Sequence, residues 1–479
     1  MKRVLALIIL LPFFFNNSSF SQSINYQKWE KITLDFQGPI SSELAQPNPF
    51  TYYRMDVTFT HEDGYPILTV PGFYATDGNA QNSSATEGNI WRVHFSAPKI
   101  GQWNYGVSFN AGENVALKTG GVSAGFMDGQ KGTLSVITTD KTGIDNRAKG
   151  RLSYVGKRYL EWAETGKPFI KVGTDSPENM LHYADFDATL DDMRKLDLVE
   201  EYRQLLKTWE PHAKDFELSA NAYTWQNGKG KNIMGAINYL SSLGLNSFSF
   251  LTNSADGDDG FVYPYITKND SIFLANHKEN KTWERALYHD RFDVSKLAQW
   301  EQVFAYSETK GMFLHFKTFE NENVSNMGKH KLTDDRKLYY RELIARFGHH
   351  LALNWNLSEE TNVDINVVRE TAAYIRNLDP YKNHVVQHTF PIGYPSKGPV
   401  QPNFEFYHEN LVGFQSELTG LSLQLQKKDI HEQVVKWVDL SEESGKPWAI
   451  ANDEQGDASD GATVDETYPG YTGKLKLDN

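Results

Sequence analysis

Short runs of alternating apolar and polar residues mark the first part of the chain, over residues 27–110. The runs read WEKITLDF, YRMDVTFTH, YPILTVPGFYA, NIWRVHFSA and WNYGVSF. Gly-Pro and Asp-Gly pairs separate several of them. A period of two between such turn signals is typical of strands, and several short strands at this spacing favour two packed antiparallel sheets. We therefore predict a small all-β sandwich over residues 27–110.

The next forty residues, 111–150, are rich in Gly, Ser, Thr and Asp. Such a composition indicates loops and turns rather than a packed element. One run within it, at 132–139, again has the character of a strand. We predict that residues 111–150 hold the last sandwich strand and a linker.

From about residue 151 onwards, strand-like runs alternate with amphipathic helices. One helix begins at Asp293, and others begin near Asp335, Ile365 and Ile430. Strands separated by helices predict a parallel sheet, because parallel neighbours need a crossover connection. The predicted strands span residues 168–176, 245–253, 312–320, 351–359, 384–390, 411–418 and 447–454.

The number and spacing of these units predict an α/β fold, a (β/α)₈ TIM-like barrel over residues 151–479. An open, doubly wound sheet is the alternative, but it predicts a Gly-rich turn after an early strand, and the sequence has none there. A barrel also needs an eighth strand to remove its edges. The 25 residues from Gln455 to Asn479 are loop-like. We therefore expect a catalytic domain that is C-terminally incomplete, unless the pattern hides one strand.

The N-terminus has the features of a secretory signal peptide over residues 1–21. Lys2 and Arg3 precede a run of about a dozen apolar residues, and Ser19-Phe20-Ser21 resembles a cleavage site. The run is too short to cross a bilayer, and no later run is longer, so we predict no transmembrane segment. The chain has no Cys. Export without disulfides indicates a bacterial periplasmic or extracellular protein.

Composition narrows the possible partners. The formal net charge is −13, which disfavours a nucleic-acid partner because phosphate binding needs a basic face. Aromatic residues make up 13% of the chain. Aromatic rings stack on sugars, although they serve as core residues more often. The oligomeric state is left open by these observations.

Candidate chemistry lies at the carboxyl ends of the predicted strands, where TIM barrels place their active sites. No Ser-His-Asp spacing, phosphate loop or HExxH motif is present, and no ligand set has zinc spacing. We therefore predict no metal and no cofactor. Polar side chains dominate these strand ends, and the ones we select are Asp175, Glu178, Asn179, His315, Glu320, Asn356, Glu359, Glu360, His388, Gln415 and Glu454.

Two of these carboxylates, Glu359 and Glu454, follow the fourth and seventh predicted strands. In a closed eight-stranded barrel these strands lie across the mouth from each other. Glycoside hydrolysis uses two carboxyl groups, about 5–5.5 Å apart in retaining enzymes and about 6.5–9.5 Å apart in inverting ones. The sequence thus predicts a candidate pair for cleavage of a glycosidic bond.

The segments around both residues resemble motifs of clan A, the large group of retaining glycoside hydrolases with TIM barrels. WAIANDEQG (448–456) looks like the strand-seven motif, and LNWNLSEETN (353–362) resembles the strand-four motif. The resemblance implies that Glu454 is the nucleophile and Glu359 the acid/base. Ser358 stands where the clan usually has the Asn that binds the sugar 2-hydroxyl, and Asn356 is the candidate to replace it.

From about residue 28 to its end, the chain resembles a group of exported candidate glycoside hydrolases that carry an N-terminal β-sandwich of unknown function. The matching segments include VGTDSPENMLHYADFD (172–187), FDVSKLAQWEQVF (292–304) and LHFKTFENEN (314–323). The resemblance implies a poly- or oligosaccharide substrate, bound by the other selected side chains. Members of the group continue with a further strand, which implies that this chain is truncated.

Several alternatives stay open at this point. Adjacent residues of a strand point to opposite faces, so we expect only one of Glu359 and Glu360 to face the mouth, with Glu360 in a supporting role. The protein could also be a non-catalytic glycan-binding protein or an inactive truncated hydrolase. A structural or adhesion module is the third class.

Overall fold

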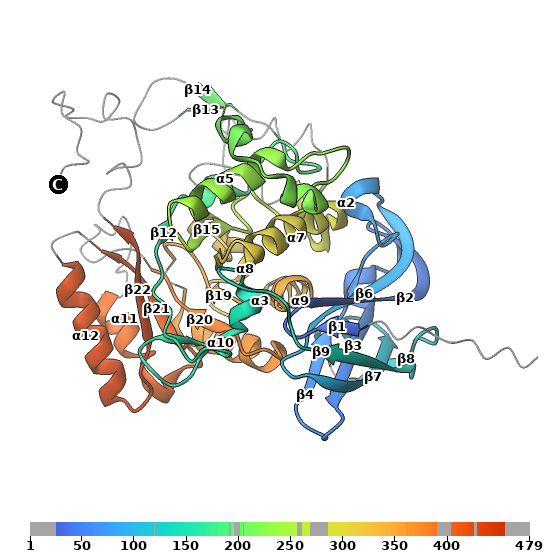
Figure 1. Cartoon of the computed structure of the whole chain (residues 1–479), viewed down its shortest axis with the longest axis horizontal. Coiled ribbons are helices and arrows are strands. Elements are labelled where there is room, and N and C mark those ends of the chain that lie inside the picture. The colour runs from blue at the N-terminus through green and yellow to red at the C-terminus, as the bar shows by residue number, and fades with distance from the viewer. Residues whose placement is uncertain are drawn as a thin grey trace, which may run out of the picture.

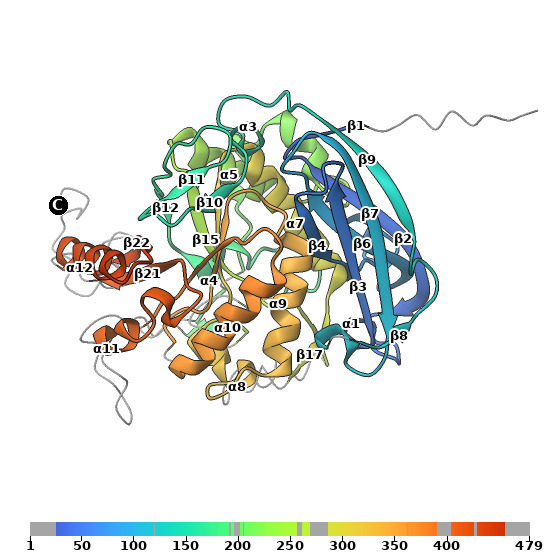
Figure 2. The ribbon, with the colours of Figure 1, turned by 90° about the horizontal axis from the view of Figure 1, so that it is seen from below.

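The computed structural model describes residues 25–118, 120–190, 193–195, 202–204, 206–255, 261–268, 286–361, 363–389, 404–425 and 429–455. The predicted signal peptide (1–21) and the loop-like segment 456–479 lie outside the described residues, so both remain predictions. Two sheets built from the N-terminal strands lie on one side of the molecule, and parallel strands with their helices fill the other (Figure 1, Figure 2).

The N-terminal strands lie where the alternation of apolar and polar residues predicts them. One sheet has the order β1-β9-β7-β3-β4, with β8 paired to β7, and the other has the order β2-β6-β5. Apart from the parallel pair β1 and β9, the paired strands are antiparallel. The strands are β1 (Asn25–Gln27), β2 (Lys31–Ser42), β3 (Tyr53–His61), β4 (Ile67–Pro71), β5 (Phe73–Tyr74), β6 (Glu87–Ser96), β7 (Gly101–Ala111), β8 (Val122–Ser123) and β9 (Lys131–Ile137).

Aromatic side chains join the two N-terminal sheets. Phe59 of β3 stacks on Phe95 of β6 with ring centroids 4.0 Å apart. Trp91 of β6 meets Phe109 of β7 at 4.9 Å, and all four rings are buried. The alternation of the sequence explains this contact, because every second residue of a strand points to the same face. One shared hydrophobic core therefore holds the two sheets together.

The parallel strands follow one another in chain order. β12 (Gly173–Thr174), β15 (Ser247–Leu251), β18 (Phe313–Lys317), β19 (Leu353–Asn356) and β20 (His384–Val386) form one sheet. A doubly wound sheet would reverse its strand order at a switch point, and this order has no reversal.

A second parallel pair, β21 (Gly420–Leu425) and β22 (Ala449–Gln455), continues this series. Two backbone hydrogen bonds connect it to the β20 region, from Thr419 N to Val385 O (2.9 Å) and from Ser422 N to Gln387 O (3.1 Å). The arrangement is consistent with a TIM-like barrel. Within the described residues the sheets do not close, because β12 and β22 each pair with one neighbour only.

One predicted strand, residues 411–418, is wrong. The backbone N–H groups of Leu411 and Val412 both donate to His408 O and so extend the last turn of α11 (Phe404–Glu409). A short 3₁₀ turn, η6 (Gly413–Gln415), follows with Gly413 at φ +68°. The apolar residues of this segment therefore end a helix, and the strand β21 begins only at Gly420.

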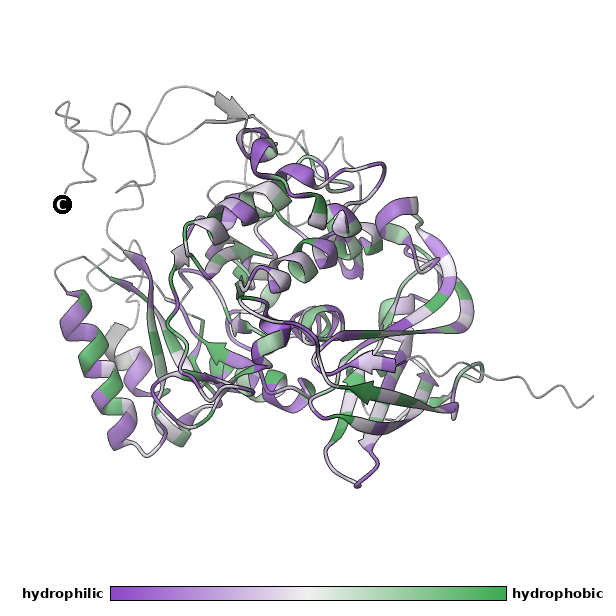
Figure 3. Cartoon of the chain, viewed as in Figure 1, coloured by the Kyte–Doolittle hydropathy of each residue, from purple (hydrophilic) through white to green (hydrophobic). Residues whose placement is uncertain are grey.

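Four long helices begin close to the predicted positions. They are α7 (Val294–Thr309), α9 (Asp334–Phe347), α10 (Ile365–Leu378) and α12 (Ile430–Glu443). A fifth, α5 (Lys231–Ser242), was not predicted. Asp293 caps α7 by accepting a hydrogen bond from Lys296 N at 2.9 Å, as is typical of a helix start. Figure 3 shows alternating hydrophilic and hydrophobic bands along α12, in which Trp437 and Ser441 are buried. Among the described residues, no helix has the length and apolar character needed to span a bilayer.

Shorter elements connect these units. They are α1 (Pro49–Tyr52), α2 (Ala80–Ser83), η1 (Val115–Leu117), α3 (Asn146–Lys149), β10 (Leu152–Tyr154), β11 (Leu160–Trp162), α4 (Pro177–Met180), β13 (Met193–Lys195), β14 (Tyr202–Gln204), η2 (Glu210–Asp215), η3 (Leu218–Tyr223), β16 (Tyr265–Thr267), β17 (Leu287–Phe292), η5 (Asn321–Asn323) and α8 (Val324–Met327).

The N-terminal sheets are fixed to helices α7 and α9. Lys31 of β2 forms an ion pair with Glu301 of α7 at 2.7 Å. Arg341 and Arg346 of α9 donate to the backbone carbonyls of Met55 and Tyr74, each at 3.0 Å. Both arginines are buried, so these hydrogen bonds tie the N-terminal sheets to α9 at sites that water does not reach.

Candidate active site

The strand β18, with the sequence FLHFK, sorts polar and aromatic side chains to opposite faces. Phe316 packs against Phe304 of α7 with ring centroids 5.2 Å apart, on the helix side of the sheet. With a period of two, His315 and Lys317 point to the other face. An imidazole and an ammonium group therefore enter the space enclosed by the parallel strands.

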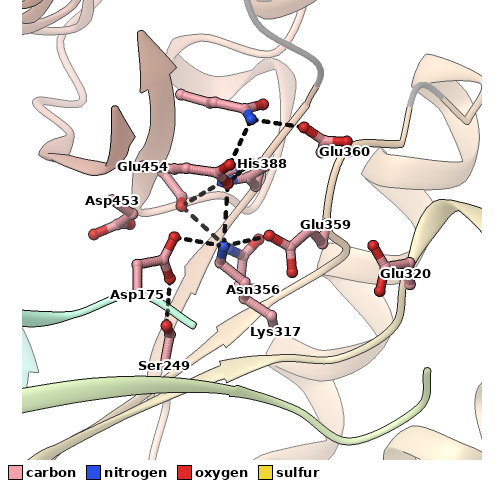
Figure 4. Close-up of polar contacts among 12 residues, drawn as sticks. Asp175, Ser249, Lys317, Glu320, Asn356, Glu359, Glu360, His388, Asp453 and Glu454 are labelled. Atoms are coloured by element: carbon pink, nitrogen blue, oxygen red, sulfur yellow. Dashed lines mark hydrogen bonds and ion pairs between the residues drawn. The ribbon is translucent and has the colours of Figure 1, made fainter. Parts of the chain in front are cut away.

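Lys317 lies at the centre of the polar contacts in this space (Figure 4). Its side chain is 0% exposed. The ammonium Nζ is 2.5 Å from Glu359 Oε1, 3.1 Å from Asp175 Oδ2 and 3.6 Å from Glu454 Oε2. Burial opposes its charge, but the surrounding carboxylates outweigh burial and raise the pKa of Lys317 well above its usual value. The group is a permanent cation.

Glu359 and Glu454 lie close together beside this cation. Their nearest carboxylate oxygens are within 4.8 Å of each other. Glu359 is 3% exposed and Glu454 is 19% exposed. Burial raises the pKa of Glu359 well above its usual value and also raises the pKa of Glu454, while Lys317 works against both shifts.

Glu360 also reaches this cluster, through Gln424 of β21. Gln424 Nε2 donates to Glu360 Oε1 at 2.6 Å and to Glu454 Oε1 at 2.7 Å. The expectation that only one of the adjacent glutamates would face the site is therefore wrong. The strand β19 ends at Asn356, and Glu360 has φ +44°, so the alternation of a strand does not apply to this pair.

Gln415 lies outside the cluster. It is exposed in η6, and its Nε2 donates to Glu409 O at 3.3 Å. Gln424, which the sequence analysis missed, occupies the strand end that we had assigned to Gln415. With the sixth strand placed at 420–425 instead of 411–418, the rule that active-site residues lie at the carboxyl ends of strands would have identified Gln424.

A second ion pair lies next to the first. Lys171, two residues before β12, contacts Asp453 of β22, and its Nζ is 2.7 Å from His315 Nδ1. Burial opposes ionisation of Asp453, but the charge and hydrogen bond of Lys171 outweigh burial and hold the pKa of Asp453 below its usual range. Burial and the neighbouring lysines lower the pKa of His315 well below its usual value, so its imidazole is neutral.

Ser422 of β21 links two further predicted residues. Its Oγ is 3.1 Å from Asn356 Nδ2 and 3.1 Å from His388 Nδ1. The other nitrogen of His388, Nε2, is 3.6 Å from Glu454 Oε2. Burial and Lys317 lower the pKa of His388 well below its usual value, so this imidazole is neutral as well. Asn356 also lies 3.1 Å from His315 Nε2.

The remaining predicted residues surround Glu359. Asp175 accepts hydrogen bonds from Lys317 and from Ser249 of β15. Carboxylate oxygens of Glu178, Glu320 and Glu359 lie within 4.8 Å of one another. Asn179, in α4, donates to Ser176 Oγ at 3.2 Å. The structure thus brings together most of the selected side chains, with Gln415 as the clear exception.

Three groups of side chains have donor atoms close enough for a metal ion. They are Glu359–His388–Glu454, Glu178–Glu320–Glu359 and, at the junction with the N-terminal sheets, Glu301–His349–His350. In the first group the ammonium of Lys317 already supplies a cation, and in the third Lys31 does so through Glu301. Proximity alone assigns no metal to the second group, and the sequence-based expectation of no metal remains a prediction.

A cavity of about 460 Å³ is lined by Asp175, His315 and Asp453 of the polar cluster, whereas Glu359 and Glu454 do not line it. It lies between the edges of β12 and β22 and is lined by residues of both strands, including Gly173 and Asp453. Gly173 is required where it stands, because a Cβ there would lie 2.1 Å from Ser247 O. Lys171, His315 and Asn354 supply its polar walls.

Comparisons with known proteins agree with the fold. Residues 25–110 match the family model described as Domain of unknown function (DUF5060). The structure is similar to that of a candidate glycoside hydrolase from Bacteroides vulgatus ATCC 8482, with 17% identity and a TM-score of 0.56. The match covers 89% of this chain and 64% of that one, so the chain spans less than two thirds of its relative.

Two further solved structures are similar over a smaller part. A glycoside hydrolase family 5 protein from the same strain has 12% identity and a TM-score of 0.37, covering 66% of this chain and 55% of that chain. An endo-1,4-beta-mannanase from Rhizomucor miehei has 12% identity and a TM-score of 0.39, covering 65% and 83%. Among curated proteins there is no match. The fold is thus a mixed α/β fold shared with a candidate glycoside hydrolase.

Proposed function

We propose that this chain is a glycoside hydrolase that cleaves a poly- or oligosaccharide with retention of configuration. The observation that carries the proposal is the buried pair Glu359 and Glu454, which follow or end β19 and β22, in the place where TIM-like barrels hold their active sites. The likeness in fold to a candidate glycoside hydrolase supports the same class of reaction.

The spacing of the two carboxyl groups supports retention over inversion. Inverting enzymes keep their carboxyl groups about 6.5–9.5 Å apart to admit a water molecule, whereas retaining enzymes keep them about 5–5.5 Å apart. Oxygens of Glu359 and Glu454 lie within 4.8 Å. This separation is closer to the spacing of retaining enzymes than to that of inverting ones, and it suits direct attack by one carboxylate.

The environments of the two residues assign their roles. Glu359 is the more buried residue, and burial raises its pKa well above its usual value, so we assign the proton and the role of general acid to it. Glu454 then attacks the anomeric carbon, while the leaving oxygen takes the proton of Glu359. Water next bonds to the anomeric carbon and gives its proton to Glu359, and the ester bond breaks to restore the Glu454 carboxylate.

We further propose the larger organisation that this function implies. Residues 151–479 form the TIM-like catalytic domain, residues 27–110 form a β-sandwich, and residues 111–150 hold the last strand of the sandwich and the linker. The aromatic contact between the two N-terminal sheets supports the sandwich. The signal peptide predicted over residues 1–21 supports export to the bacterial periplasm or the medium.

The first prediction tests the pair. Glu359→Gln should lower kcat by about 100- to 10,000-fold, the usual contribution of a general acid, and Glu454→Ala should lower it further. The substrates are a panel of 4-nitrophenyl glycosides and plant and algal polysaccharides, assayed by release of nitrophenol or reducing ends. Added azide should restore turnover of Glu454→Ala and give a glycosyl azide of inverted configuration.

A matched control is Glu443→Gln, an exposed glutamate in α12, which should leave kcat unchanged. The stereochemistry of the first product, followed by proton NMR, separates the two mechanisms. A product of inverted configuration from the unmodified chain would reject the retaining mechanism. Full activity of Glu454→Ala would reject the role of this residue.

Binding of a glycan without cleavage is the second candidate function. The unpaired edges of β12 and β22 favour it, because a catalytic pair needs a rigid frame and these strands have one paired neighbour each in the described part of the chain. Saturable binding of an oligosaccharide from the same panel, with no product after prolonged incubation, would replace the hydrolase by a glycan-binding protein.

A further inference from the structure

Lys317 occupies a position that the two-glutamate mechanism does not by itself require. Its ammonium lies between the two candidate catalytic carboxyl groups, 2.5 Å from Glu359 Oε1 and 3.6 Å from Glu454 Oε2. The side chain is fully buried at the end of β18, and Asp175 holds it from a third side at 3.1 Å. The cation therefore contacts both carboxyl groups from one fixed place.

The charges around the pair do not cancel when all of them are ionised. Lys317 carries one positive charge, while Asp175, Glu359 and Glu454 carry three negative ones. Two uncompensated charges in a buried site are costly, so the cluster retains a proton. The titratable side chains that face the pair from the surrounding elements are Asp175, Glu178, Lys317, Glu320, Glu360 and His388.

The proposed reaction moves negative charge between the two contacts of Lys317. Before the first step Glu454 is the carboxylate and Glu359 carries the proton. After that step Glu454 is a neutral ester, and Glu359, which has given its proton to the leaving oxygen, is the carboxylate. The second step reverses both changes, because Glu359 accepts a proton from water and Glu454 regains its charge.

We propose that Lys317 is a positioning residue that compensates this negative charge at either glutamate without moving. The inference rests on the proposed function, since it assumes the roles given to Glu359 and Glu454. A preorganised cation stabilises charge in both steps because no reorganisation is needed when the charge changes place. A residue that only fills space would not couple the two carboxyl groups in this way.

The test replaces the ammonium and measures both protonation and rate. Lys317→Met should raise the pKa of Glu359 and of Glu454, because an ammonium favours the ionised form of a carboxyl group beside it. Both limbs of the pH profile of kcat/KM should therefore move to higher pH. We expect kcat to fall on the order of 100-fold, as for loss of one preorganised group, with KM changing much less.

Both chemical steps should slow in this variant. An aryl glycoside with a good leaving group makes the second step limiting, and one with a poor leaving group makes the first step limiting. Lys317→Arg keeps the charge and should restore part of the rate and of the original pH profile. The control is Lys31→Met, which removes the lysine paired with Glu301 at 2.7 Å, far from the pair in the fold, and should leave the pH limbs in place.

Titration of the free protein separates the inference from the proposed function. Carbon-13 NMR of labelled glutamate side chains, assigned by loss of signals in Glu359→Gln and Glu454→Gln, gives the two pKa values without any substrate. Unchanged pKa values in Lys317→Met, or a loss of rate with unmoved pH limbs, would overturn the role of Lys317. Raised pKa values in a chain that cleaves no glycan would instead reject the proposed hydrolase function. The proposed movement of negative charge between Glu359 and Glu454 would then be rejected as well. If Lys317→Met does not fold, Lys317→Arg takes its place. This variant keeps the charge, so its pKa values should stay unchanged, and a rate lowered in one of the two chemical steps only would overturn the proposal.

Discussion

At the scale of single residues, the side-chain amide of Gln424 joins two acidic side chains, and a third lies beside one of them. Gln424 Nε2 donates to both Glu360 and Glu454, and Glu454 lies beside Glu359. The hydrogen bond from Gln424 favours the ionised form of Glu454. The carboxylate of Glu454, the proposed nucleophile, is thereby held in place by a side chain thirty residues earlier in the sequence.

Removing this amide should weaken the nucleophile. We expect Gln424→Leu to lower kcat/KM by on the order of 10- to 100-fold, the usual effect of losing a hydrogen bond to a charged group. The acid limb of the pH profile should move to higher pH, because Glu454 loses a donor that favours its charge. Gln415→Leu is the matched control, since Gln415 is exposed in η6 and should tolerate the change. Equal losses in the two variants would contradict the assignment.

Glu359 and Glu454 could be selected from the sequence because both lie at the carboxyl ends of clear strand patterns. TIM barrels place their active sites at these ends, and the rule holds even when the exact bounds of a strand are not known. Lys317 was not selected, although the residue ends the run FLHFK. A lysine at the end of an apolar strand is equally consistent with a side chain that is exposed to solvent. Only the fold shows that three carboxyl groups converge on it, since Asp175, Glu359 and Glu454 come from strands far apart in the sequence.

At the scale of elements, aromatic pairs form part of the shared core between the two N-terminal sheets. Phe59 and Phe95 stack between β3 and β6 at 4.0 Å, and neither ring is exposed. These strands were predictable because their alternation is regular and turn residues separate them. The position of β21 was not, because the apolar residues before it complete the helix α11 and give the same local signal as a strand.

Truncating one ring of this contact should loosen the strands around it. Phe95→Ala should lower the free energy of opening of β3, β6 and β7 by about 3–5 kcal/mol, the usual cost of removing a buried aromatic ring. Hydrogen exchange followed by mass spectrometry measures this opening strand by strand in the full chain. Phe126→Ala is the control, because Phe126 is 65% exposed and its loss should change exchange very little. A similar effect of both changes would show that the ring contact does not join the sheets.

At the scale of the whole molecule, an ion pair spans the two sheet edges beside the cavity. Lys171 precedes β12, Asp453 belongs to β22, and the two strands form no backbone hydrogen bond with each other in the described part of the chain. Lys317 makes a second connection, from Asp175 to Glu454. Ion pairs between side chains therefore connect β12 and β22, which no backbone hydrogen bonds join in the described part of the chain.

The ion pair between Lys171 and Asp453 makes the free energy of unfolding depend on pH. The pKa of Asp453 in the folded protein lies below the value of about 3.9 of an unfolded aspartate. Its contribution to stability is therefore present above about pH 4 and is lost as the pH falls toward the folded pKa. We expect Asp453→Asn to lower the unfolding temperature at pH 6, with the difference from the unmodified chain shrinking between pH 4.5 and pH 3. Thermal scans at a series of pH values measure it, and a difference that does not shrink would contradict the prediction.

The open side between β12 and β22 also has a mechanical meaning. A sheet ladder fixes the distance between neighbouring strands at about 4.8 Å, whereas an ion pair between long side chains accepts a range of separations. Backbone hydrogen bonds therefore hold neighbouring strands at fixed distances around most of the acidic cluster. In the described part of the chain, the strand ends with Asp175 and Asp453 are joined by ion pairs instead, so the distance between them is easier to change. The ion pair between Lys171 and Asp453 is largely buried, so salt screens it little, and we expect the width of the mouth there to respond to acid rather than to ionic strength.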